Sequence, residues 1–205
     1  MPDISTILFD VGGVLLSNGW DHAERMVVLS HFSIDRTSYE QRHESANDAW
    51  ERGFITAEQF LTQTIFFEPR SFTPAEFLED MKAQQQVLAE GAMRILGELR
   101  ASRKIKLAML NNESRELNDY RIEHFQLDEF FDEFFSSCYL GLRKPEPNIF
   151  RLALDVLQRE AAEVFFIDDR QENCDAAMSL GIHAVLYRNP TQLEQDLAHL
   201  GVRST

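Results

Sequence analysis

Short hydrophobic runs alternate with longer amphipathic stretches along most of the chain. Each run has four to six residues rich in Val, Ile, Leu or Phe, which is typical of strands buried on both faces of a parallel sheet. Between the later runs the pattern is helical, and Pro147 and Gly181 stand where such helices would begin and end. This pattern predicts an α/β fold, a Rossmann-like parallel sheet flanked by helices. The predicted strands are 4–9, 105–110, 134–138, 164–167 and 184–187, and the helices around them are 87–101, 114–123, 147–158, 171–180 and 190–199.

The first two predicted strands are separated by roughly 90 residues, far more than a single crossover helix requires. This stretch is largely helical by pattern, for example over 21–31, 38–52 and 57–66. We therefore expect an inserted α-helical cap subdomain over residues 16–88, next to an α/β core made of residues 1–15 and 89–205. The alternative is that these helices simply extend the main core.

The composition limits the classes of partner. The chain has 205 residues, of which 44% are hydrophobic and 26% charged, and its formal net charge is −14. Such a negative field repels nucleic acid, and no cluster of Lys and Arg opposes it, so nucleic acid is not an expected partner. No segment has the roughly 20 uncharged apolar residues of a membrane span, and the N-terminal segment lacks the basic flank of a signal peptide. Cys138 and Cys174 are too few for a disulfide framework, which favours a cytoplasmic location.

The first predicted strand ends in an aspartate that two glycines closely follow, in the run ILFDVGGVL. Ligands of open α/β sheets bind beyond the carboxyl ends of the strands, which is where Asp10 is placed. Gly12 and Gly13 would let backbone N–H groups approach a bound group closely. The alternative is that Asp10 only caps a helix or forms a turn.

The fourth predicted strand ends in two adjacent carboxylates, Asp168 and Asp169, in the run VFFIDDR. At a buried position they would repel each other unless a cation lies between them or one is protonated. A hard divalent ion with oxygen ligands meets this need, and Mg²⁺ suits a site that also holds phosphate. Asn173, one helical turn further on, could orient a ligand carboxylate. The alternative is a turn with both carboxylates in solvent.

Two further polar segments lie between these strand ends. Lys144 precedes Pro145 in GLRKPEPNIF, and the proline holds the lysine in a defined loop ahead of the next helix. Its ammonium could neutralise a nucleophile and a phosphoryl group, or it is an ordinary surface lysine. Asn111 and Asn112 end the second predicted strand and could donate hydrogen bonds to a phosphoryl oxygen. Alternatively, Asn112 or Ser114 only caps the following helix.

The order of these features resembles that of the haloacid dehalogenase superfamily over nearly the full chain. The segments FDxGGV, RKPEPxIF and FIDDxxxN together carry the resemblance. It implies that Asp10 is the nucleophile of the first motif and that Asn111 stands at the Ser or Thr position of the second. Lys144 would be the lysine of the third motif, and Asp168 and Asp169 the acidic pair of the fourth. The insertion resembles the family's helical C1-type cap, and WERGFITAEQF resembles a stretch common in its small-metabolite phosphatases.

This resemblance implies a Mg²⁺-dependent phosphomonoester hydrolase acting on a small phosphorylated metabolite. Asp10 would attack phosphorus to form an aspartyl phosphate, which water then hydrolyses. The metal would be held by Asp10, the Gly12 carbonyl and Asp169. Asp168 would support the metal's waters or Lys144. Lys144 and the residue of the second motif would stabilise the charge on the phosphoryl oxygens.

Two positions depart from the usual family pattern. Most family phosphatases have a second Asp, acting as general acid and base, where this chain has Gly12, and such a group typically contributes about 10²–10⁴-fold. Its loss matters least for an acidic leaving oxygen, and some sugar-1-phosphate phosphatases of the superfamily also have glycine there. We therefore expect substrates such as sugar 1-phosphates or acyl phosphates, unless a cap residue such as His22 supplies the proton. Asn111 can donate to a phosphoryl oxygen but is longer than a hydroxyl residue and could crowd the site.

Two other functions stay open. Haloacid dehalogenases of the superfamily also lack the second Asp, but they need no metal and have small polar residues where this chain has its acidic pair. A catalytically impaired phosphate-binding or interaction protein would account for Gly12 and Asn111, but it would not need a nucleophile. Trp20 and Trp50 in the predicted cap are candidates for substrate contact, or they belong to its core. The sequence is compatible with a monomer or a homodimer.

Overall fold

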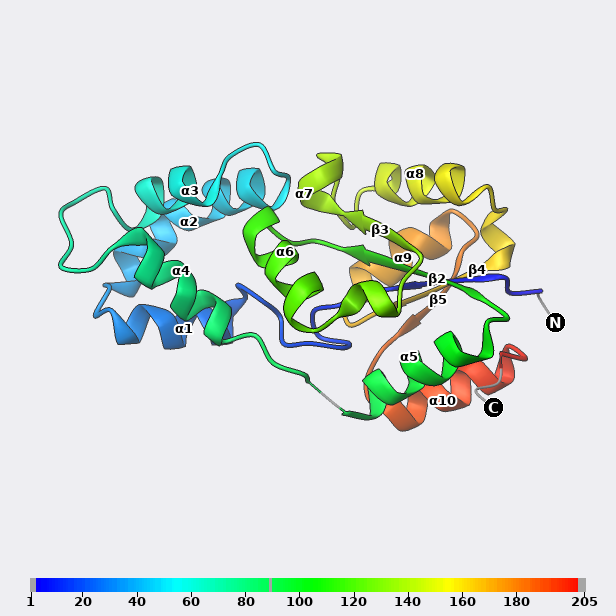
Figure 1. Ribbon diagram of the computed structural model, residues 1–205. Helices are drawn as coiled ribbons and strands as arrows, with labels where there is room; N and C mark the ends of the chain where they lie inside the picture. The colour runs from blue at the N-terminus through cyan, green and yellow to red at the C-terminus, as the bar shows by residue number, and fades with distance from the viewer. Residues whose placement is uncertain (1–2, 89, 203–205) are drawn as a thin grey trace.

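The centre of the molecule is a five-stranded parallel sheet with the strand order β3-β2-β1-β4-β5 (Figure 1). The computed structural model describes residues 3–88 and 90–202. Every residue of β1 and β4 is buried, because helices cover both faces of the sheet, and their sequences are therefore continuous hydrophobic runs. This confirms the predicted α/β fold. The strands are β1 (Thr6–Phe9), β2 (Lys106–Asn111), β3 (Glu133–Ser136), β4 (Val164–Asp168) and β5 (His183–Leu186).

Two layers of helices bury the two faces of the sheet. Ile7 and Phe9 of β1 belong to one hydrophobic cluster, whereas Leu8 between them belongs to the other, as the two-residue period of a strand requires. The first cluster contains side chains of α5 (Glu90–Ser102) and α10 (Pro190–His199), and the second those of α8 (Pro147–Leu157) and α9 (Gln171–Ser179). Each sequence-predicted helix of this part is present, with ends that differ by a few residues.

The remaining elements of the sheet part are short or lie at its edge. The predicted third strand extended to Cys138, but β3 ends at Ser136 and the buried Cys138 lies in a helical turn. A short apolar run does not by itself distinguish strand from buried helix, which explains this error. These elements are α6 (Arg115–His124), α7 (Ser137–Leu140) and the 3₁₀ turns η1 (Leu127–Glu129) and η2 (Ala161–Glu163).

Four helices between β1 and α5 lie together beyond one end of the sheet (Figure 1), and we call them the four-helix unit. They are α1 (His22–His31), α2 (Arg36–Glu51), α3 (Ala57–Thr64) and α4 (Pro74–Ala83). They share a hydrophobic cluster of their own, in which Trp20, Trp50 and Phe77 are buried. The expected division into a cap of 16–88 and a core of 1–15 and 89–205 stays a prediction. Its residues 1–2, 89 and 203–205 lie outside the described part.

Two chain segments join the four-helix unit to the sheet, and both are bound by one buried arginine. Arg121 of α6 donates from Nη2 to the carbonyl of Ser17 and from Nε to Oε1 of Gln85, both over 2.6 Å. Glu113 is the buried counter-ion, with its Oε2 3.2 Å from Nη1 of Arg121. The two segments also pair directly, since the N–H of Ser17 donates to the carbonyl of Gln86. This network holds the four-helix unit against the sheet.

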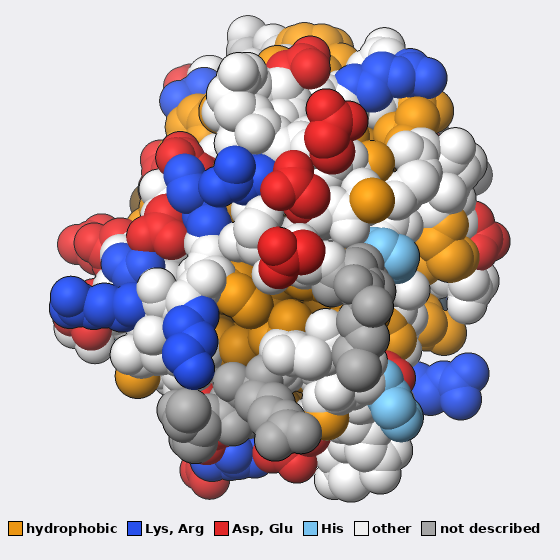
Figure 2. All heavy atoms as spheres, turned by 90° about the vertical axis from the view of Figure 1, so that its right-hand side faces the viewer, with side chains coloured by type: hydrophobic (Ala, Val, Ile, Leu, Met, Phe, Trp, Pro, Cys, Tyr) orange, Lys and Arg blue, Asp and Glu red, His pale blue; other side chains and the backbone are white. Residues whose placement is uncertain are grey.

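Figure 2 shows one face of the molecular surface. Acidic and basic side chains are interspersed on the face of the molecule that Figure 2 shows, around a small hydrophobic area. Of the helices that the structure describes, none is both long enough and apolar enough to span a bilayer.

Candidate active site

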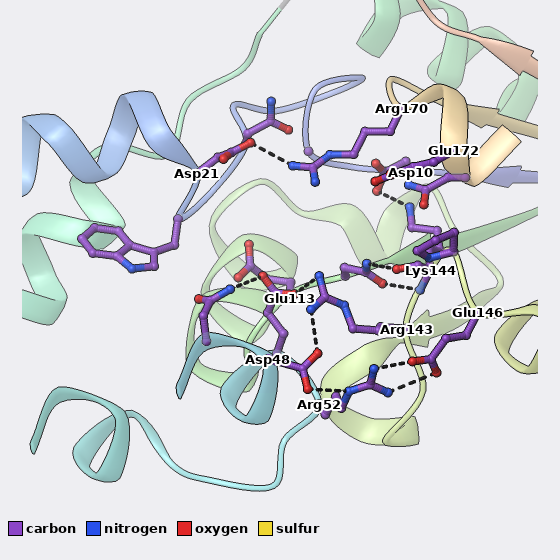
Figure 3. Close-up of a pocket in the computed structure, with 18 of the residues that line it drawn as sticks. Asp10, Asp21, Asp48, Arg52, Glu113, Arg143, Lys144, Glu146, Arg170 and Glu172 are labelled. Carbon is purple, nitrogen blue, oxygen red and sulfur yellow. Dashed lines mark hydrogen bonds and ion pairs between the residues drawn. The ribbon is translucent and has the colours of Figure 1, made fainter. Parts of the chain in front are cut away.

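A cavity of about 440 Å³ lies at the carboxyl ends of the central strands, and residues of the four-helix unit line its other side (Figure 3). Asp10 follows β1 and Asp168 ends β4, and these two strands are direct neighbours in the sheet. Because parallel strands present their carboxyl ends at one edge, residues far apart in the sequence meet here. Trp20 and His43 reach the same cavity from the four-helix unit.

Lys144 is the central cation of this site. Its Nζ lies 2.9 Å from Oδ1 of Asp10 and 2.6 Å from Oδ2 of Asp168, and the residue is only 2% exposed. Asn112 fixes the lysine's backbone, since its Oδ1 accepts from the Lys144 N–H and its Nδ2 donates to the Lys144 carbonyl. Burial would lower the pKa of Lys144, but the two carboxylates outweigh this and raise it. The lysine is therefore a fixed positive charge.

The nucleophile candidate is oriented by two donors. The N–H of Val11 donates to Oδ1 of Asp10 over 2.7 Å, and Lys144 approaches the same oxygen. Burial raises the pKa of Asp10 to about 7 even though Lys144 opposes the rise, and the charges of Asp168 and Asp169 add to it. An ionised Asp10 thus requires more positive charge than the lysine alone provides.

Three carboxylates form a group that could hold a metal ion. Asp10, Asp168 and Asp169 each offer one oxygen, and these oxygens lie within 4.8 Å of one another. Asp168 is otherwise engaged, because its Oδ1 accepts from the N–H of Arg170 and from Nδ2 of Asn173, and its Oδ2 meets Lys144. Oδ1 of Asp169, in contrast, is buried and has no hydrogen-bond partner among the described residues. Lys144 contacts two of these three carboxylates, and Arg170, which also acts on Asp169, is already paired with Asp21. The excess negative charge makes this donor set fit a hard cation such as Mg²⁺.

The two glycines after Asp10 play different parts. Gly13 has a φ of +73°, and a Cβ there would lie 2.0 Å from Oδ2 of Asp169. Glycine is thus required both by the backbone and by the close approach of that carboxylate. Gly12 lines the cavity, and a Cβ there would lie 3.1 Å from Oδ1 of Asn18. The region where a second acidic side chain would project is bordered by Asn18.

The structure does not bring Asn111 to the cavity. Its side chain is buried, and Nδ2 donates over 3.0 Å to Oδ1 of Asn118 in α6. Asn112, the next residue, lines the cavity instead, but its amide is occupied by the backbone of Lys144. Among the described residues that line the cavity, no side chain of the second motif is free to meet a phosphoryl oxygen.

Of the two tryptophans predicted to contact substrate, only one lines the cavity. Trp20 lines the cavity and donates from Nε1 to the hydroxyl of Tyr39. Trp50 lies outside it, stacks on Phe60 and donates from Nε1 to Oε2 of Glu116 in α6. Its contacts are those of a residue that attaches the four-helix unit to the sheet part.

His22, the candidate proton donor, lies outside the cavity as well. Its Nε2 faces Nη2 of Arg36 at 2.9 Å on the surface of the four-helix unit. Of the described histidines, His43 is the one that lines the cavity.

Sequence reasoning missed a set of ion pairs that cross the cavity mouth (Figure 3). Arg143, next to Lys144, contacts Asp48 and Glu51 of α2, each over 2.8 Å. Arg143 and its partners are about ninety positions apart in the chain, so no local sequence motif indicates that they pair. Two more pairs span the same interface, Arg52 with Glu146 and Arg170 with Asp21.

Comparison with known proteins agrees with this geometry. The family model of the haloacid dehalogenase-like hydrolases matches residues 4–181. The chain belongs to this family. A haloacid dehalogenase family enzyme from Bacteroides thetaiotaomicron has a TM-score of 0.79 and 20% identity, covering 98% of this chain and 99% of that one. Its complex with magnesium and inorganic phosphate has a TM-score of 0.74 and 20% identity, covering 93% and 98%. These likenesses show that the hydrolase shares their fold.

Two curated relatives resemble this chain in sequence and are longer than it. Acyl-CoA dehydrogenase family member 10 of Mus musculus is 27% identical over 97% of this chain and 20% of its own length. Flavin mononucleotide hydrolase 1, a chloroplast protein of Arabidopsis thaliana, is 27% identical over 75% of this chain and 61% of its own length. The hydrolase thus spans about a fifth and about three fifths of these two relatives.

Proposed function

We propose that this hydrolase is a Mg²⁺-dependent phosphatase that acts on a small phosphorylated metabolite through an aspartyl phosphate on Asp10. The observation that supports this most is the arrangement around Lys144, which touches both Asp10 and Asp168 while Oδ1 of Asp169 has no partner. A nucleophilic carboxylate, a fixed ammonium and an unsatisfied acidic ligand form the set that phosphoryl transfer by way of a carboxylate requires. The names of relatives such as the Arabidopsis flavin mononucleotide hydrolase support the same class.

The reaction would proceed in two in-line steps. Asp10, oriented by the Val11 N–H and Lys144, attacks phosphorus and expels the leaving oxygen; a water then attacks the aspartyl phosphate and restores the carboxylate. Mg²⁺ held by Asp10, the Gly12 carbonyl and Asp169 would cancel charge between nucleophile and phosphate. Lys144 stabilises the charge that spreads over the phosphoryl oxygens. Asp168 keeps the lysine in place.

The two predicted positions for a general acid supply no proton donor in the cavity, and this bears on the preferred leaving group. Gly12 offers no carboxylate, and His22 lies outside the cavity, so neither can protonate a leaving oxygen. A leaving oxygen that is already acidic needs such help least. We therefore favour sugar 1-phosphates or acyl phosphates. The residues that line the cavity are largely polar and include the indole of Trp20, which suits a hydroxylated metabolite.

A second candidate is a phosphate-binding protein with impaired catalysis. It is favoured by Gly12 and by the side chain of Asn111, which bonds Asn118 instead of facing the cavity. A dehalogenase-type reaction is less favoured, because such relatives need no metal and this chain keeps two carboxylates at Asp168 and Asp169.

The test is phosphate release from glucose 1-phosphate, acetyl phosphate and glycerol 3-phosphate, with Mg²⁺ or with EDTA. The wild type is compared with Asp10→Asn and with a control, Asp155→Asn, on the exposed side of α8. We expect Mg²⁺-dependent turnover that Asp155→Asn keeps and Asp10→Asn loses. Absence of turnover on every substrate, together with calorimetric binding of inorganic phosphate, would favour the binding protein.

A further inference from the structure

One cation of the cavity is poorly compensated. The other five each have a carboxylate oxygen within 3.2 Å, whereas the nearest carboxylate to Arg25 of α1 is that of Glu40, at 3.5 Å. The Glu40 side chain is 35% exposed, so solvent screens it, while the Arg25 side chain is only 11% exposed. A nearly buried guanidinium thus lines the cavity with an ion pair that is longer than those of the other five cations and is screened by solvent. The five compensated cations are Arg52, Arg121, Arg143, Lys144 and Arg170.

The hydrogen bonds of Arg25 are also incomplete. Nη1 donates to the carbonyl of Trp20 over 3.2 Å and meets Nε2 of His43 at 3.3 Å. Nε of Arg25 is buried and has no partner among the described residues. A buried N–H that stays unpaired is costly, so a ligand acceptor at this position would stabilise this arrangement of Arg25.

His43 and Asn47 of α2 also line the cavity. Burial lowers the pKa of His43 to about 4, and the charge of Arg25 adds to the decrease, so the ring is neutral at physiological pH. Because a guanidinium only donates, Nε2 of His43 is the acceptor of their contact, and His43 does not add a second cation. Asn47 donates from Nδ2 to Glu51, and its side chain also hydrogen-bonds the His43 ring, which opposes the lowering of the His43 pKa by burial.

We infer that Arg25 binds a second anionic group on the leaving group of the substrate, a carboxylate or a second phosphate. This rests on the proposed phosphatase function. The phosphoryl group at Lys144 and the second anion at Arg25 would occupy the sheet side and the four-helix side of one cavity. An anion at this position accepts from the guanidinium of Arg25 and compensates its charge. The substrate class is therefore a phosphorylated acid or a bisphosphate.

Three glucose derivatives that differ only at carbon 6 test the assignment: glucose 1-phosphate, glucuronic acid 1-phosphate and glucose 1,6-bisphosphate. We expect kcat/KM for at least one of the two anionic compounds to exceed that for glucose 1-phosphate by about tenfold or more, the value of one charge-assisted hydrogen bond. The preferred compound distinguishes a carboxylate from a phosphate. Arg25→Met should bring this ratio close to one. The matched control Arg36→Met, an exposed arginine at the start of α2, should keep the wild-type ratio.

A second variant and a binding measurement separate the possible failures. Asn47→Asp adds a carboxylate to the part of the cavity wall that α2 forms and should lower the preference for the anionic compounds, whatever the stability of Arg25→Met. Affinities of Asp10→Asn for the three compounds are measured by calorimetry with Mg²⁺. Turnover of all three at similar kcat/KM would overturn the subsite and leave the phosphatase standing. Tighter binding of the anionic compounds without turnover by the wild type would support the subsite and overturn the phosphatase.

Discussion

The substitution Gly13→Ala should disable the metal site without unfolding the protein. A Cβ at this position would lie 2.0 Å from Oδ2 and 2.3 Å from Cγ of Asp169. Non-bonded heavy atoms pack at about 3.5 Å, so the Asp169 carboxylate must move by roughly 1 Å or more. The obstructing atoms are the end of a side chain, which can rotate away, and not backbone. The expected result is a folded protein whose acidic cluster has lost the position of one ligand.

Two magnitudes follow from this geometry. The φ of +73° at Gly13 makes a side chain there cost about 1–2 kcal/mol of stability. Loss of ligand orientation at a metal site typically weakens metal binding by about 10–100-fold. We therefore expect the Mg²⁺ concentration for half-maximal phosphate release to rise by that factor. The stabilisation of the protein by Mg²⁺ in thermal unfolding should fall in parallel, which gives a readout independent of turnover.

Gly181→Ala is the matched control. Gly181 has a φ of +88°, but a Cβ there would meet only the Cβ of Ala161, at 3.6 Å, and it lies outside the active-site cavity. It should lose a similar free energy of unfolding and keep the wild-type response to Mg²⁺. The reasoning is refuted if Gly13→Ala keeps the wild-type Mg²⁺ midpoint, or if Gly181→Ala shifts it equally.

Three further predictions concern other parts of the site. Trp50→Phe should lower the free energy of unfolding by about 1–3 kcal/mol, because Oε2 of Glu116 loses its hydrogen-bond donor. KM should stay unchanged, and a raised KM with unchanged stability would contradict this prediction. His43 in the unfolded chain binds a proton between its ordinary pKa of 6.5 and its folded value of about 4, so the wild type should lose stability as pH falls through this range. His43→Gln should lose less in denaturant titrations, and an equal slope would reject the assignment. Gly12→Asp, which requires a small shift of Asn18, should raise turnover of alkyl phosphates by up to about 10²-fold; an unchanged dependence on leaving-group pKa would argue against the missing-acid explanation.

The sequence was sufficient where local pattern and topology act together. The continuous hydrophobic runs of β1 and β4 favour strands buried on both faces, and a parallel sheet then places Asp10 and Asp168 at the same edge. The proline-bounded loop and the family resemblance marked Lys144 as a candidate, and in the structure it lies close to both. These features depend on strand order and strand ends, which hydrophobic runs and turn residues mark in the sequence.

Only the tertiary structure decided which of two neighbouring candidates faces the cavity. Successive residues at a strand end point in different directions, so Asn111 turns to Asn118 while Asn112 holds Lys144. A tryptophan of a helical unit can lie on either of its faces, and only packing showed that Trp20 lines the cavity.

The partners of the charged residues were likewise beyond the sequence. Arg143 and Asp48 carry no motif, and they pair because the four-helix unit packs over the carboxyl ends of the strands. The weak compensation of Arg25 is a property of the folded protein, in which every other cation that lines the cavity has a closer counter-ion. Local sequence thus determined which residues gather at the strand ends, whereas the packing of the four-helix unit on the sheet determined the ion pairs, the cavity and the groups that meet the substrate. Such long-range pairing depends on side-chain direction and on the distance between elements, which no short pattern encodes.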